Sequence, residues 1–133
     1  MGMMRKQYHS RRVGADRHSW DVHRLVRLSR GLPVETIAVS DIAEIDELWW
    51  YQPGDGAPTP RSIAEHMRLV DETDLRWPIL LCAEGRLMDG MHRVVKAMKE
   101  GRSEIRAVRF RPTPEPDFVN VDVNTLPYPD EEV

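Results

Sequence analysis

The chain has 133 residues, 41% of them hydrophobic and 31% charged, which suffices for one domain with a modest core. Its single cysteine excludes an internal disulfide and a cysteine-based zinc knuckle, and no apolar run approaches the ~20 residues of a membrane helix. Because no signal-peptide pattern opens the chain, we expect a cytoplasmic protein without a membrane partner.

Charge is distributed unevenly, and the formal net charge of −3 gives no global basic field that would recruit nucleic acid. Residues 1–30 carry eight basic and two acidic side chains, whereas residues 112–133 carry six acidic side chains and no basic one. The basic segment indicates contact with phosphate or nucleic acid; the alternative is a solvated terminus, or one that pairs with the acidic segment. The predicted parts are a basic N-terminal arm over 1–18, an α/β domain over 19–111 and an acidic, proline-rich tail over 112–133.

Periodicity gives the expected elements. Residues up to Arg12 show no apolar period, so no regular structure is predicted there. Beyond them, helices are predicted where apolar residues recur every three to four positions, and strands where short apolar runs lie between turn residues. In chain order these are a helix over 20–30, a strand over 34–39, a helical turn over 40–45, a helix opening at Pro60 and strands over 79–83 and 87–88. A helix that follows Asp89-Gly90 and runs to Glu100 comes next, and then a strand over 105–111. The alternation predicts an α+β fold with helices packed on a small mixed β-sheet.

Two of these helices have predicted core faces. In the helix that opens at Pro60, Ser62 and Glu65 have the spacing of a capping box. The apolar residues expected to face the core are Ile63, Met67 and Val70 in that helix, and Met91, Val94, Val95 and Met98 in the next. Cys82 is expected to be a small buried hydrophobic residue, and His66 to be half-buried and structural.

An aromatic cluster, Trp49-Trp50-Tyr51, precedes a loop over 52–60 that is rich in proline and glycine. Aromatic rings beside such a loop have two interpretations. They stack on a nucleobase or another apolar ligand, or they cover the core beneath the loop, which is the commoner arrangement.

The segment from Ile79 to Lys99 carries the clearest indication of chemistry, because a strand, a turn and a second strand lead directly into a helix at Asp89-Gly90. The first amides of a helix have no partner within it, and a glycine there leaves room for a ligand. Since His92 and Arg93 point away from the apolar face, they predict a pocket for a phosphate or a carboxylate. The alternative is that Asp89 simply caps the helix and that both following side chains are solvated.

The sequence Asp89-Gly90-Met91-His92-Arg93 resembles the G-x-H-R helix start of the ParB/sulfiredoxin superfamily. The order of the surrounding elements is also similar, and the resemblance extends over roughly 33–111. It implies a nucleotide-phosphate site at the start of this helix, with a further basic residue on the preceding helix. The residues so implied to bind the nucleotide are Gly90, Met91, His92, Arg93 and Arg61. Arg68, two turns further along the helix of Arg61, is expected to reach the same side.

Departures from the family pattern decide between its branches. Met91 stands where sulfiredoxins have their catalytic cysteine, so sulfiredoxin activity is not expected. A segregation protein is not expected either, because a proline-rich acidic segment follows the motif region where those proteins have a helix-turn-helix domain. The motif is nearest to the D-G-H-H-R of the free-serine kinase branch, although the extra chain of those kinases is missing. That resemblance implies catalytic roles for Asp89 and for Glu47 or Asp46, whose carboxylates would orient the attacking hydroxyl or hold Mg²⁺.

Two functions follow as hypotheses. The first is a nucleotide-binding phosphotransferase that uses ATP or another nucleotide with Mg²⁺ and acts on a small molecule or a protein. The second is a non-catalytic module whose pocket binds a nucleotide or a nucleic-acid end, with the charged termini as partner contacts. A nuclease ranks third, because no carboxylate cluster demands two metal ions and no metal site is predicted. A fold whose site has decayed is a further alternative.

Overall fold

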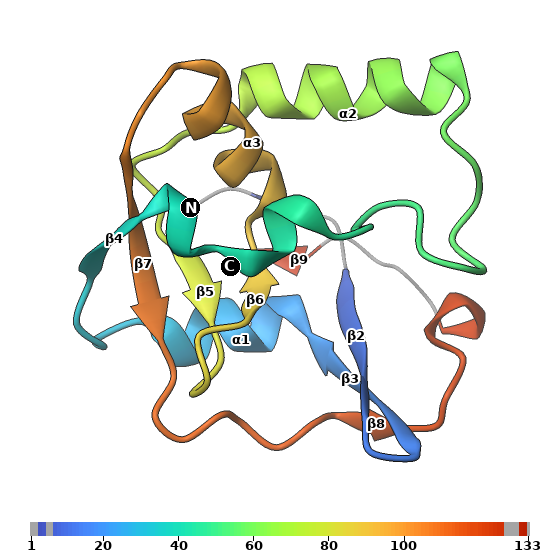
Figure 1. Ribbon diagram of the computed structural model, residues 1–133. Helices are drawn as coiled ribbons and strands as arrows, with labels where there is room; N and C mark the ends of the chain where they lie inside the picture. Colours follow the sequence, from blue (N-terminus) through green and yellow to red (C-terminus); the bar gives the residue numbers. More distant parts are fainter. Residues whose placement is uncertain (1–2, 5–6, 127–130, 133) are drawn as a thin grey trace.

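The computed structural model describes residues 3–4, 7–126 and 131–132 and has an α+β fold (Figure 1). Its helices are α1 (Val22–Ser29), α2 (Pro60–Glu72) and α3 (Met91–Lys99), with 3₁₀ turns at Val39–Asp41, Ala43–Asp46 and Val123–Thr125. Its strands are β1 (Met3–Met4), β2 (Tyr8–Val13), β3 (Asp16–Asp21), β4 (Glu35–Ala38), β5 (Ile79–Leu81), β6 (Leu87–Asp89), β7 (Glu104–Arg109), β8 (Phe118–Val119) and β9 (Glu131–Glu132).

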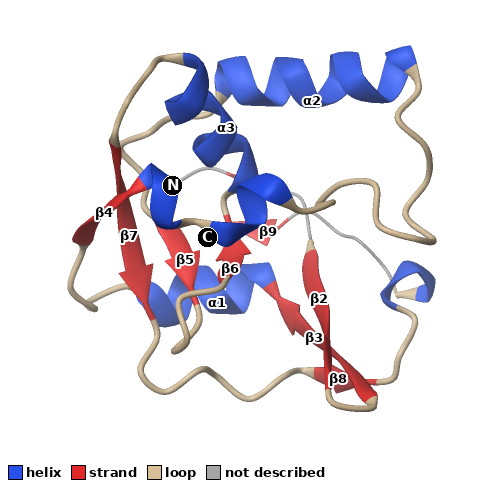
Figure 2. Ribbon diagram, viewed as in Figure 1, coloured by secondary structure: helices blue, strands red, loops and turns tan. Residues whose placement is uncertain are grey.

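The central sheet is small and mixed, as predicted, and its strand order is β4-β7-β5-β6 (Figure 2). Strand β5 is parallel to β7, whereas β4–β7 and β5–β6 are antiparallel pairs. Helix α3 packs on one face of the sheet and α1 on the other, and α2 lies against α3. The hairpin of β5 and β6 leads straight into α3, so the sheet fixes where that helix begins.

Both faces of the central sheet are covered, which explains the continuous apolar run over 79–82. Ile79 and Leu81 belong to the cluster beneath α3, while Leu80 and Cys82 belong to the cluster that contains Leu25 of α1. All four of these sheet residues are at most 3% exposed. A strand buried on both faces reads as an uninterrupted hydrophobic run rather than an alternating one. The prediction that Cys82 is buried is confirmed.

The expectation of no regular structure up to Arg12 is wrong for Tyr8–Val13, because β2 and β3 form an antiparallel hairpin, and β8 pairs with β3. Residues 1–2 and 5–6 of that segment lie outside the described residues. Trp20 lies at the end of β3 rather than in the predicted helix. Its ring is 2% exposed, and its Nε1 donates to the Pro114 carbonyl oxygen at 2.8 Å. The helix begins only at Val22, where the Asp21 side chain accepts from the amide of His23 at 2.9 Å.

Helix α2 also differs from its predicted contacts. Thr59 caps it by accepting from the amide of Ser62, in place of the predicted capping box. Ile63 and Met67 are 43% and 55% exposed, and only Val70 of that predicted face is buried. The reason is the position of α2, which packs against the single helix α3 rather than against the sheet. Only a small part of its apolar face is therefore buried.

Helix α3 buries Met91, Val94 and Ala97, whereas the predicted core residue Met98 is 46% exposed. The buried face is thus slightly rotated from the predicted one and leaves His92 and Arg93 only partly buried. Among the helices in the described part of the chain, none is long and apolar enough to cross a membrane.

Candidate functional site

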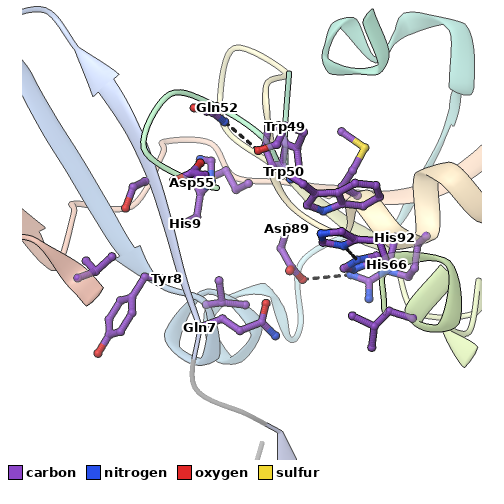
Figure 3. Close-up of a pocket in the computed structure, with 18 of the residues that line it drawn as sticks. Gln7, Tyr8, His9, Trp49, Trp50, Gln52, Asp55, His66, Asp89 and His92 are labelled. Carbon is purple, nitrogen blue, oxygen red and sulfur yellow. Dashed lines mark hydrogen bonds and ion pairs between the residues drawn. The ribbon is translucent and has the colours of Figure 1, made fainter. Parts of the chain in front are cut away.

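A cavity of about 1020 Å³ lies between the start of α3 and the β2–β3 hairpin, and we call it the α3 cavity. Figure 3 shows the two walls, with Trp50 and His92 on one side and His9 of β2 on the other. Residues 120–123 complete the lining. This volume is at the upper end of the usual range for cavities that hold small ligands.

The start of α3 forms part of the cavity wall, and its backbone is built around Gly90. This residue has φ of 112°, and a Cβ placed on it would lie 2.7 Å from Cγ2 of Ile79. The first bond of the helix runs from the amide of Val94 to the Gly90 carbonyl at 3.0 Å, and no side chain caps the helix. No carbonyl within the helix can therefore accept from the amides of residues 91–93, and this end is partly positive.

Asp89 and Arg93 form an ion pair on the same wall. The Arg93 Nη2 donates to Asp89 Oδ2 at 3.1 Å and to the Pro78 carbonyl at 3.3 Å. The two side chains are only 16% and 18% exposed, and the buried Arg93 Nε has no hydrogen-bond partner among the described residues. Asp89 is therefore not the helix cap that one sequence interpretation assigned to it. Its carboxylate instead holds a guanidinium beside the helix start.

Three aromatic side chains stack beside this pair, as Figure 3 shows. The ring of Trp50 lies 4.0 Å from that of His66 and 4.8 Å from that of His92, with both pairs nearly parallel. The Nδ1 of His66 and the Nε2 of His92 are 2.9 Å apart and share a hydrogen bond. The predicted half-burial of His66 is confirmed, but its partner lies on another helix and 26 residues away in the sequence.

Burial keeps the cavity histidines neutral. It lowers the pKa of His92 to about 4, with smaller contributions from the neighbouring His66 and from the charge of Arg93. Burial also lowers the pKa of His66 and, together with Arg11 and Arg17, lowers the pKa of His9 to about 3. At neutral pH the positive charge of this wall is therefore that of Arg93 and the helix end, because the imidazoles carry none.

These lowered pKa values predict that the chain is acid-sensitive. His9 and His92 titrate at 6.5 when unfolded and near 3 and 4 when folded, so the unfolded chain binds more protons between these values. The stability they support is complete above pH 6.5 and is lost as the pH falls toward 4. We expect a lower thermal unfolding midpoint at pH 5.0 than at pH 7.5, and a smaller loss in His92→Gln. Equal losses in both proteins would contradict this assignment.

Four of the predicted site residues, including Asp46 as the alternative to Glu47, lie outside the described lining of the α3 cavity. Glu47 pairs with both terminal nitrogens of Arg86, at 2.7 and 3.0 Å, and this hydrogen bonding lowers the pKa of its carboxyl. Arg68 bonds to Glu65 and Glu72 on the surface of α2, which raises its pKa. Arg61 is exposed at the start of the same helix. The structure thus brings together Asp89, Gly90, Met91, His92 and Arg93, but not Asp46, Glu47, Arg61 or Arg68.

The opposite wall was missed by sequence reasoning. His9 and Arg17 come from the hairpin, and Asn120 comes from the acidic segment. Asn120 has φ of 60°, and its side chain accepts from the Arg17 amide at 2.9 Å and donates to Asp16 at 3.0 Å. These contacts join residues about a hundred positions apart, so no local pattern could have indicated them.

Among the residues that the structure describes, no group of three or more His, Cys, Asp or Glu side chains is arranged to hold a metal ion. Comparisons with protein-family models, curated proteins and solved structures gave no match. The chemistry of the site therefore has to be argued from its own geometry.

Proposed function

We propose that the α3 cavity binds the phosphates of a nucleotide, and that the chain is a nucleotide-binding domain of the ParB/sulfiredoxin type. The observation that carries the proposal is that the helix start and the Arg93 guanidinium meet on the wall of one large cavity. Amides at a helix start and an arginine are complementary to phosphate in both charge and geometry.

When a phosphate binds, we expect the Arg93 guanidinium to exchange its bond to Asp89 for bonds to the phosphate oxygens. Its Nε is buried without a described partner, which costs about 1–3 kcal/mol for an unsatisfied polar group. A phosphate at the helix start offers oxygens that can accept from this guanidinium, so binding relieves the deficit and loosens the bond to Asp89. The nucleotide base has Trp49 and Trp50 on the cavity lining as stacking surfaces.

Asp89 is the group that makes a phosphotransferase reaction possible. Released from Arg93, its carboxylate accepts the proton of an acceptor hydroxyl while the hydroxyl oxygen bonds to the terminal phosphorus. The bond from that phosphorus to the bridging oxygen breaks, and the nucleoside diphosphate leaves with the electron pair. Glu47, held by Arg86 away from the cavity lining, has no part in this proposal.

The described cavity lining is acidic as a whole, which bears on the form of the nucleotide. It includes the arginines 17 and 93 against the carboxylates of Asp55, Glu72, Asp89 and Asp122. With the histidines neutral, a free tetra-anionic nucleotide meets net repulsion. We therefore propose that the nucleotide binds as its Mg²⁺ complex, since Mg²⁺ commonly uses one or two protein carboxylates together with phosphate oxygens.

The experiment is thermal unfolding with ATP, ADP, CTP and GTP, each with and without Mg²⁺. A ligand at 100 times its dissociation constant stabilises the native state by about 2.7 kcal/mol, a shift of several degrees. We expect a shift that needs Mg²⁺, that is lost in Arg93→Ala and that is retained in Asp89→Asn.

Arg76→Ala is the matched control, because Arg76 is an exposed arginine outside the described cavity lining. Its nucleotide shift should equal that of the wild type. No shift with any nucleotide, or an undiminished shift in Arg93→Ala, would overturn the proposed function.

A further inference from the structure

A second feature lies at the end of the β2–β3 hairpin and shares only Arg17 with the described lining of the α3 cavity. Strand pairing places Arg12 directly opposite Arg17, and Arg11 directly opposite His18, next to the turn at residues 14–15. We call these four residues the basic hairpin. Like charges directly opposite each other on a strand pair destabilise it, so the hairpin forms at an electrostatic cost.

Within the described part of the chain, no carboxylate pairs with the two exposed arginines of this cluster, Arg12 and Arg17. The one acid at the turn, Asp16, accepts a hydrogen bond from Asn120 instead. Several arginines elsewhere are paired, among them Arg24 with Asp117, Arg86 with Glu47 and Arg111 with Glu35.

The backbone of the hairpin that carries these charges is also held in place. The hydroxyls of Ser10 and Ser19 are 2.7 Å apart, and β8 pairs with the opposite edge of β3. Trp20 fastens the base of the hairpin to the core, and the Arg11 guanidinium lies 5.1 Å from the centre of its ring. A ligand that binds here does not have to order the backbone, which lowers the cost of binding.

We propose that the basic hairpin contacts the phosphate backbone of duplex DNA. A two-stranded ribbon fits the major groove of B-DNA, and arginines on it can reach phosphates on its rims. A single strand is disfavoured because such sites need exposed aromatic platforms, whereas Trp20 is 2% exposed. The acidic net charge of the chain limits the contact to a weak, sequence-independent one.

The test is fluorescence anisotropy of a labelled 20-base-pair duplex with the full chain at several salt concentrations. Each phosphate contact contributes about 0.9 to the slope of log affinity against log salt. We expect Arg12→Ala/Arg17→Ala to lower that slope by about 1.8 and to weaken binding roughly tenfold or more at low salt. Arg12→Lys/Arg17→Lys should keep most of the slope, because the charges remain.

Arg30→Ala/Arg106→Ala is the matched control, since it removes two exposed arginines elsewhere and changes the net charge equally. Its slope should stay at the wild-type value. The proposal is overturned if both double variants lose binding equally, if no duplex binding is measurable at 50 mM salt, or if a single strand or anionic vesicles bind better than the duplex. Binding of the duplex by Arg93→Ala, with its nucleotide shift lost, would separate the two sites.

Discussion

Gly90→Ala is expected to destabilise the chain by about 3 kcal/mol. The left-handed backbone costs an L-residue roughly 1–2 kcal/mol, and forcing a methyl group into a packed site costs roughly 1–3 kcal/mol. Both costs apply here, because φ is 112° and the new Cβ would lie 2.7 Å from Ile79 and 2.9 Å from the Arg93 guanidinium. Urea unfolding of the wild type and the variant measures the difference.

Gly101→Ala provides the control for this prediction. Gly101 also has positive φ, 69°, but a Cβ there would meet nothing within 4 Å. Only the backbone term remains, so the expected loss is about 1 kcal/mol. Equal losses in the two variants would show that the start of α3 is not tightly packed against β5.

Arg86→Ala is expected to cost about 2–4 kcal/mol, because it leaves the Glu44 carboxylate buried without its charge partner. Glu44 is 1% exposed, accepts from the Arg86 Nε at 2.8 Å and accepts from the amide of Leu87 at 3.2 Å. This expected loss of stability lies toward the low end of the range for buried ion pairs, because Arg86 itself is 46% exposed and water can solvate its guanidinium. Denaturant unfolding is again the measurement.

Glu47→Gln separates the loss of the buried Arg86–Glu44 ion pair from the loss of the exposed Arg86–Glu47 ion pair. Glu47 also pairs with Arg86 but is 44% exposed, and exposed ion pairs are worth less than about 1 kcal/mol. A loss in Glu47→Gln as large as that in Arg86→Ala would contradict a role for the buried Glu44 pair.

Much of the fold around the site could be predicted from local sequence. The apolar run over 79–82, the turn at Gly85 and the change of period after Gly90 indicate two strands followed by a helix, and the structure has β5, β6 and α3 there. Each of these signals lies within a few residues of the element that it specifies. The positions of Asp89, Gly90, Met91, His92 and Arg93 on one wall follow from the same local pattern.

The remainder depends on contacts between distant segments. Strands β2 and β3 are largely polar on both faces, and they are fixed by Trp20 and by pairing with residues near 118. Arg68 is predicted to reach the nucleotide, but in the structure it pairs with Glu65 and Glu72, which lie about one turn before and after it on the same helix. The prediction did not take these two carboxylates into account. The catalytic role of Glu47 rests on the family resemblance alone, whereas its contact with the distant Arg86 decides where its carboxylate points.

The amide chemical shifts of the chain during a titration with ADP and Mg²⁺ test the central claim most directly. If the α3 cavity binds the phosphates, the largest changes fall on the amides of Gly90, Met91, His92 and Arg93, and Arg93→Ala removes them. Changes confined to the basic hairpin, or to the surface of α2 around Arg68, would contradict a phosphate site at the start of α3.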